Sequence, residues 1–303
     1  MARLVYLGTP DAAVAPLRTL VDAGHDVALV VSRPDKRRGR GATLVPSPVK
    51  AAALGLGLPV TDSLDDAVGV GAELGVVVAY GRIVPVAVLE RLPMVNLHFS
   101  LLPRWRGAAP VERAILEGDA ETGVCLMAVE AGLDTGGIYA EDDTAIDDDE
   151  SVDELRARLV VIGCRLLDQH LGGGLAGLPV PRDQVGTPSY AEKIRPEELE
   201  LQWELPAYQL RRVVRLGRSW TTFRGKRLRV LRAASAAAPD AAGRGPGGAD
   251  TVDGPGQLDG DLVAAGEGSR LRLVTVQPEG RQPMDAGSWL RGARPAPGER
   301  LGG

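Results

Sequence analysis

The sequence predicts an α/β protein in two parts: a doubly wound, Rossmann-like parallel sheet followed by a small β-barrel. In residues 1–188, short runs of Val and Leu such as Leu4–Leu7 alternate with amphipathic helical patterns such as that from Val14 to Val21. Continuous apolar strands separated by helices are typical of a parallel sheet covered on both faces. Strand candidates in residues 206–303 are short and broken by Gly and Pro, as in small barrels.

The first part contains five segments with the composition of buried strands. A Pro-Asp turn follows the first of them, and Gly24 ends the first amphipathic helix. A second helix, over Val152–Leu171, is expected to close the domain. The expected strands are Leu4–Leu7, Val27–Val31, Leu74–Ala79, Val95–Phe99 and Gly123–Val129.

The second part divides into four short strands and one long loop. Residues 233–256 are so rich in Ala, Gly and Pro that they cannot bury enough apolar surface to become ordered, which predicts a mobile loop. We therefore expect a domain over 1–188, a linker over 189–205 and a domain over 206–303. The expected strands of the barrel are Trp220–Phe223, Arg227–Leu231, Gln257–Ala265 and Arg270–Gln277.

The net charge of −5 combines an acidic part and a basic part. Residues 1–205 hold 19 Lys and Arg against 31 Asp and Glu, whereas residues 206–303 hold 16 against 9. The stretch from Pro206 to Arg232 has nine basic residues and no acid. A basic domain on an acidic body often binds a polyanion, so this stretch is a candidate phosphate-facing surface. On charge alone, a solvated basic face explains it equally well.

Several function classes lack their signatures here. The turn LGTPDAAVA has one glycine where a dinucleotide-binding turn needs three, and no P-loop occurs. Cys125 and Cys164 have no metal-ligand spacing. No apolar run approaches the ~18 residues of a membrane span. We expect a cytoplasmic protein that uses no NAD, FAD or metal and does not contact a membrane.

Asn96 and His98 form a candidate catalytic pair. Residues two apart in a strand share a face, and an amide donor beside an imidazole suits acyl transfer. Taken alone, a half-buried pair without a catalytic role is the commoner case. Their position favours catalysis, because doubly wound folds place their chemistry where strands end, here at the loop Ser100–Pro103. Asp134, in the turn GLDTGG after the next strand, adds an acid, although a turn-forming role fits it equally well.

A basic loop in the acidic domain is a second candidate binding element. Residues 33–41, RPDKRRGRG, contain five basic residues and one acid. Arg suits bidentate phosphate recognition and Gly permits close approach of a ligand to the backbone. The loop favours phosphate contact over the alternative, a solvated charged loop.

Ten segments, which include the motifs above, carry a family resemblance: LGTPD, SRPDKRRGRGATLVPSPVK, VVVAYGRIVP, NLHFSLLPRWRGAAP, GDAETGV, GLDTGGI, YAEKI, WTTFRGKRLRV, VQPEGRQPM and LRGARPAPGERL. In this order, and over nearly the whole chain, they resemble the methionyl-tRNA formyltransferase family. Asn-x-His with a distant Asp is shared by all formyltetrahydrofolate-dependent formyltransferases. The RWRGAAP continuation, the basic loop and the basic second domain are similar to the tRNA-acting branch.

The resemblance implies a reaction and a set of site residues. The formyl donor would be 10-formyltetrahydrofolate, and the acceptor would be the α-amino group of methionyl initiator tRNA, bound partly by an OB-like barrel. Asn96 and protonated His98 would stabilise the oxyanion, and Asp134 would orient His98 and help to move the proton. A monomer is expected. The folate-binding residues would be Ser100, Leu101, Leu102, Pro103, Tyr80 and Gly81, and the tRNA-binding residues Arg37, Arg38, Arg40, Lys226 and Arg227.

Two other functions compete with this one. The same three residues could serve a formyltransferase for an amino-sugar nucleotide or another small amine, although one sugar nucleotide does not require so basic a domain. An RNA-binding protein on a catalytically silent scaffold would keep the basic domain, but the intact Asn96, His98 and Asp134 argue against it.

Overall fold

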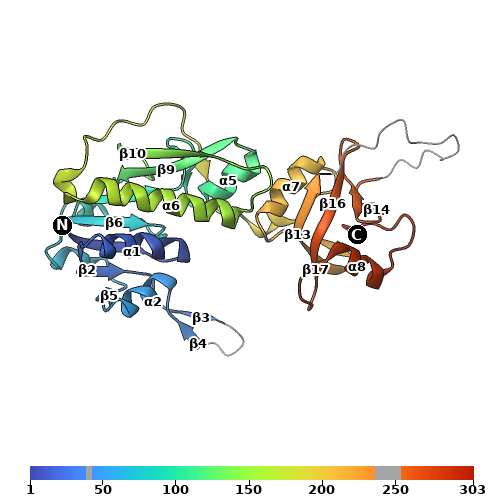
Figure 1. Ribbon diagram of the computed structural model, residues 1–303, viewed down its shortest axis with the longest axis horizontal. Coiled ribbons are helices and arrows are strands. Elements are labelled where there is room, and N and C mark those ends of the chain that lie inside the picture. Colours follow the sequence, from blue (N-terminus) through green and yellow to red (C-terminus); the bar gives the residue numbers. More distant parts are fainter. Residues whose placement is uncertain (39–42, 236–253) are drawn as a thin grey trace. The chain divides into compact units, whose positions relative to one another are not determined.

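The structure is a computed structural model that describes residues 1–38, 43–235 and 254–303. Its contacts divide the chain into two units (Figure 1). Unit 1 comprises Met1–Ala114, Ala120–Ile146 and Glu154–Glu192, and unit 2 comprises Ile115–Asp119, Asp147–Asp153 and Lys193–Gly303. Arg40 and most of the predicted mobile loop lie outside the described residues.

A seven-stranded sheet forms the centre of unit 1 in the order β10-β9-β7-β6-β1-β2-β5. Five of these strands are mutually parallel, which confirms the doubly wound prediction for this part of the sheet. The strands are β1 (Arg3–Gly8), β2 (Asp26–Val31), β5 (Val60–Thr61), β6 (Leu74–Val78), β7 (Met94–His98), β9 (Glu121–Ala128) and β10 (Ile138–Ala145).

The remaining two strands correct the expectation of a wholly parallel sheet. β9 runs antiparallel to β7, and β10 runs antiparallel to β9. In β10 buried and exposed positions alternate, because this edge strand has a solvated face. Because strands were predicted from continuous apolar runs, β9 was predicted and β10 was not.

Helices cover both faces of the sheet. On one face, Val5 and Leu7 of β1 pack in a buried cluster with Ala67 of α3 and Val88 of α4. On the other face, Gly163 of α6 lies against Leu97, and a Cβ added there would be 3.1 Å from the leucine Cδ1. The helices of this region are α1 (Val14–Asp22), α2 (Pro48–Gly55), α3 (Asp65–Gly69), α4 (Val86–Leu89), α5 (Pro110–Glu117) and α6 (Val152–Leu171), the last over the predicted range.

Strand β3 (Lys36–Arg38), in the described part of the predicted basic loop, pairs antiparallel with β4 (Thr43–Val45) to form a hairpin. Two contacts fix its base. Lys50 Nζ lies 2.7 Å from Asp35 Oδ1, and the buried hydroxyls of Ser32 and Ser47 are 2.6 Å apart. Ser47 also caps α2 by accepting a hydrogen bond from the Lys50 amide, which positions the helix directly after the hairpin.

After α6 the chain returns as an extended segment, residues 182–191, which we call the strap. Arg182 and Ile138 exchange backbone hydrogen bonds of 2.8 and 2.9 Å. At the other end of the strap, β11 (Tyr190–Ala191) pairs in parallel with β8 (Arg106–Gly107). The strap therefore joins the chain entering β10 to the loop that follows β7.

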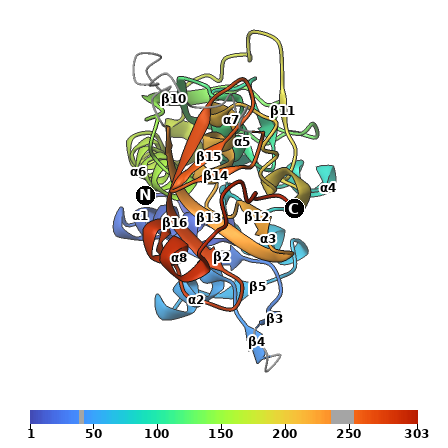
Figure 2. The same ribbon diagram turned by 90° about the vertical axis from the view of Figure 1, so that its right-hand side faces the viewer.

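Unit 2 contains an antiparallel sheet in the order β12-β13-β16-β15-β14, with β17 beside β16. Figure 2 shows α8 of this unit in the foreground, in red. Its core includes an edge-to-face contact between the rings of Phe223 and Trp289, with centroids 5.2 Å apart. The elements are α7 (Ala207–Arg215), β12 (Trp220–Phe223), β13 (Lys226–Ser235), β14 (Leu258–Asp259), β15 (Leu262–Ala264), β16 (Arg270–Pro278), β17 (Met284–Asp285) and α8 (Ala286–Ala293).

One strand prediction in unit 2 is wrong. The segment predicted as a single strand, Gln257–Ala265, is a hairpin of β14 and β15. Gly260 lies in the turn with φ of +58°, a conformation that glycine adopts without strain. The two turn residues are Gly260 and Asp261. Gly-Asp between two strand candidates is a hairpin signal, which the single-strand prediction overlooked.

Candidate active site

The candidate site lies where β7 ends, in the sheet of unit 1. Asn96 and His98 alternate along the strand with the buried Leu97, so both polar side chains lie on the face opposite to it. His98 is itself only 5% exposed. Its position beside the antiparallel β9, opposite Cys125, encloses the ring between strand and loop.

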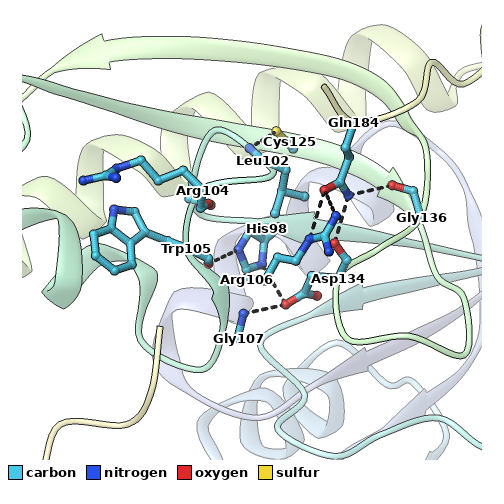
Figure 3. A network of polar contacts seen from close by, with 11 residues as sticks. His98, Leu102, Arg104, Trp105, Arg106, Gly107, Cys125, Asp134, Gly136 and Gln184 are labelled. Atoms are coloured by element: carbon cyan, nitrogen blue, oxygen red, sulfur yellow. Dashed lines mark hydrogen bonds and ion pairs between the residues drawn. The ribbon is translucent and has the colours of Figure 1, made fainter. Parts of the chain in front are cut away.

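The contacts of His98 define its protonation pattern (Figure 3). Nε2 lies 2.8 Å from the backbone oxygen of Trp105. Because a carbonyl only accepts hydrogen bonds, Nε2 must carry a proton. Nδ1 lies 3.6 Å from Oδ2 of Asp134, which is an ion-pair distance and too long for a direct hydrogen bond. A second proton, on Nδ1, would therefore face a carboxylate.

Asp134 is held at the site by its own backbone and by the loop after β7. It has a left-handed backbone with φ of +50°, which Asp tolerates better than most residues. Its Oδ2 accepts a 2.8 Å hydrogen bond from the Gly107 amide. One loop, Trp105–Gly107, thus contacts both His98 and Asp134.

The turn that carries Asp134 fits tightly against β9. A Cβ added to Gly136 would lie 2.8 Å from the carbonyl carbon of Ala128 and closer still to its oxygen, so this position requires glycine. The turn therefore packs directly against the backbone of β9.

Asn96 is half-buried. Its side-chain amide makes no hydrogen bond to any residue within the described part of the chain. An amide on the same face as His98 is thus available to a ligand oxygen.

The loop Ser100–Pro103 uses most of its side chains to hold its own shape. The Ser100 hydroxyl donates to the Arg104 carbonyl at 2.6 Å, and the Leu102 amide donates to Cys125 Sγ at 3.4 Å. Leu102 packs with Cys125 in a buried cluster, and Pro103, which follows a cis peptide bond, is buried as well. Of the four side chains, only that of Leu101 is partly exposed, so a ligand here would meet it and the loop backbone.

Tyr80 and Gly81 differ in their exposure. Tyr80 is 2% exposed and packs in the buried cluster beneath the sheet, where its hydroxyl has no hydrogen-bond partner among the described residues. Gly81 is exposed, with φ of +77°. Of the two residues, only Gly81 is accessible at the surface.

Comparison with known proteins identifies the family. A formyl transferase model matches residues 2–170, and a model of the formyl transferase C-terminal domain matches residues 193–294. The methionyl-tRNA formyltransferase of Methylobacterium sp. (strain 4-46) is 41% identical and that of Acidothermus cellulolyticus 42% identical, each covering 99% of both chains.

The chain belongs to the methionyl-tRNA formyltransferase family. This confirms the resemblance seen in the sequence motifs.

Two solved structures share the fold of this family member. The methionyl-tRNA formyltransferase from Clostridium thermocellum matches with a TM-score of 0.55 over 77% of this chain and 93% of its own, at 15% identity. An N-formyltransferase from Helicobacter canadensis, in complex with folinic acid and dTDP-3-aminofucose, matches with a TM-score of 0.67 over 92% and 100%, at 16% identity. At these identities the likeness concerns the fold alone.

The expected tRNA-binding side chains of this formyltransferase family member are only partly described. Arg37 is exposed on the β3–β4 hairpin, the backbone alone of Arg38 is described, and Arg40 lies outside the described residues. Lys226 and Arg227 are exposed on β13, and the Arg227 guanidinium stacks 4.0 Å above the Trp220 ring. A cavity of about 210 Å³ adjoins Arg227, lined also by Arg229, Gln277, Pro278, Glu279 and Gly280.

Five of the nine basic residues between Pro206 and Arg232 are already engaged by protein groups. Arg211 pairs with Asp149 at 3.0 Å and Arg224 with Glu299 at 2.6 Å, while the other three bond to carbonyl or amide oxygens. Within the described part of the chain, those whose side chains make no hydrogen bond or ion pair are Arg218, Lys226, Arg227 and Arg232. The candidate phosphate-facing surface is thus smaller than the composition suggests.

Sequence reasoning overlooked the groups that hold His98 and Asp134 in place. The Trp105 carbonyl and the Gly107 amide are backbone atoms, which residue types do not reveal. Their segment, RWRG, contributed to the family resemblance without receiving a role. The described residues contain no group of three His, Cys, Asp or Glu placed to hold a metal ion, and no helix there is long and apolar enough to span a membrane.

Proposed function

We propose that this chain transfers the formyl group of 10-formyltetrahydrofolate to the α-amino group of methionyl initiator tRNA, giving N-formylmethionyl-tRNA for translation initiation in the cytoplasm. Family membership over 99% of the chain supports the reaction. The observation that supports the assignment of residues is the contact of Asp134 with His98 at the end of β7, with Asn96 on the same face of that strand.

The reaction exchanges one carbon–nitrogen bond for another. The amine nitrogen bonds to the formyl carbon, and the bond from that carbon to the folate nitrogen breaks. One proton leaves the amine and one reaches the folate nitrogen, so no oxidant or metal is required. Catalysis then needs a group that stabilises the transient oxyanion and a path for the proton.

The geometry suits Asn96 and His98 to the oxyanion. The Asn96 amide is unengaged by the described residues, and a proton on His98 Nδ1 would add a positive charge on the same face. The bond from Nε2 to the Trp105 carbonyl fixes the ring, so little reorganisation is needed during the reaction.

Asp134 is suited to accept the proton that the amine loses. Its side chain is 15% exposed, and the Gly107 amide keeps one oxygen turned toward His98. At 3.6 Å from Nδ1, the carboxylate also faces the His98 ring and can orient it.

Transfer from 10-formyltetrahydrofolate should be assayed with methionyl initiator tRNA and, in parallel, with an amino-sugar nucleotide. We expect formylation of the tRNA. His98→Ala should lower kcat at least ~10²-fold, the scale of general acid–base loss, while His170→Ala on α6 serves as the matched control. Transfer to the sugar alone would refute the proposed acceptor, and equal kcat for the two variants would remove His98 from the mechanism.

Binding of tRNA should weaken steeply with salt, because phosphate contacts release counterions. Arg37, Arg218, Lys226, Arg227 and Arg232 are the described candidates for such contacts. Five contacts predict a slope of roughly −4 for log K against log salt. A slope near zero in a filter-binding titration would contradict the proposed surface.

A further inference from the structure

The strap holds the catalytic turn through a single side chain, that of Gln184. Its Nε2 donates to the backbone oxygens of Asp134, at 2.8 Å, and of Gly136, at 2.9 Å (Figure 3). Its Oε1 accepts from Nε and Nη2 of Arg106, at 3.1 and 2.6 Å.

Chemistry fixes the orientation of the Gln184 amide. Carbonyl oxygens only accept hydrogen bonds and guanidinium groups only donate, so exchanging the amide oxygen and nitrogen would break all four bonds. Both amide protons are therefore used on the turn.

Burial supports a specific role for this side chain. Gln184 is half-buried, whereas its neighbours Asp183 and Val185 are exposed, the latter to 87%. The strap thus turns one polar side chain inward, between the turn of Asp134 and the loop of Arg106. It lies between the two segments that the family models match, 2–170 and 193–294.

The link matters because Asp134 has a left-handed backbone and contacts His98 only at ion-pair distance. Two of the bonds that fix this turn end on Gln184, and Arg106 lies beside Gly107, whose amide binds the Asp134 carboxylate. One side chain therefore couples the backbone of the turn to the loop that holds both Asp134 and His98.

We propose that Gln184 is a positioning residue for formyl transfer, which sets the place of the Asp134 carboxylate relative to His98. This rests on the proposed function of Asp134. Gln184 touches no reacting atom in this assignment. Its effect must pass through Asp134 and should appear in kcat rather than in the KM for either substrate.

The test compares full-length variants in the formylation assay. Gln184→Glu keeps the shape and the acceptor for Arg106 but removes both donors, and Gln184→Ala removes the contacts without adding charge. Gln169→Glu, on an exposed position of α6, is the matched control. We expect kcat to fall at least ~10-fold in both Gln184 variants, with each KM within about twofold of the control value.

A double-variant cycle separates positioning from general destabilisation. In the Asp134→Asn background, under single-turnover conditions, Gln184→Glu should change the rate by less than about twofold, because its target is already lost. A full additional fall, a kcat equal to that of Gln169→Glu, or failure of both Gln184 variants to fold would each overturn the proposal.

The outcome also distinguishes this proposal from the function on which it rests. A wild-type enzyme that formylates the tRNA while Gln184→Glu is unimpaired refutes only the positioning role. If the wild type transfers formyl to the amino-sugar nucleotide instead, the same variants are compared on that substrate. No transfer to either acceptor overturns both.

Discussion

Replacing Gly136 by alanine should slow formyl transfer while leaving the protein folded. The added Cβ would lie 2.8 Å from the Ala128 carbonyl carbon, whereas ordinary contacts begin near 3.4 Å. The turn must therefore move from β9 by at least ~0.6 Å. Because Asp134 is two residues away in the same turn, its carboxylate moves as well. A displacement of about 1 Å can cost ~10²-fold in rate, so we expect kcat to fall roughly 10-fold.

Gly172→Ala provides the control for this change. Gly172 follows α6, and a Cβ there meets nothing within 4 Å. Both variants should be assayed for kcat at saturating folate and tRNA, and their thermal unfolding compared. If Gly136→Ala turns over as fast as Gly172→Ala, the tight fit of the turn does not set the position of Asp134.

Three further predictions concern buried groups. Burial raises the pKa of Cys125 to about 12, so iodoacetamide at pH 8 should alkylate it only after unfolding; mass spectrometry of native and denatured protein checks this. Burial and the N-terminal charge lower the pKa of His25 from 6.5. The unfolded state therefore binds the proton more readily than the folded state. As a result, the free energy of unfolding should fall as pH drops below about 6.5. Urea denaturation at several pH values should show this fall, and His25→Asn should reduce it. Tyr80→Phe removes a hydroxyl that no described residue satisfies, so the free energy of unfolding should stay constant or rise by up to about 1 kcal/mol; a clear loss would indicate an unrecognised partner.

The sequence predicted best those elements whose environment stays the same, or repeats regularly, along their whole length. The buried strands β1 and β6 have mostly apolar runs and the helix α6 has a steady helical period, and the sequence reveals both patterns. β10 has one solvent-exposed face and several acidic residues, so its sequence resembles that of a loop until its pairing with β9 is known.

The candidate site divides in a similar way. Strand parity alone predicts that Asn96 and His98 share a face. The proximity of Asp134 to His98 depends on how two loops pack, and Gln184 lies in a polar segment with no periodicity. Its importance comes from the backbone oxygens it reaches, and those are fixed only by the tertiary fold.

The strap also determines where the chain can be truncated to give a separate catalytic fragment. The family model for the first domain ends at residue 170, which would suggest a fragment that stops with α6. Such a fragment would lack the strand partner of β8 and the side chain that ties down the Asp134 turn. An independently expressed catalytic fragment should therefore extend to Glu192, the last residue of unit 1, and shorter ones should fold with a loosened active site.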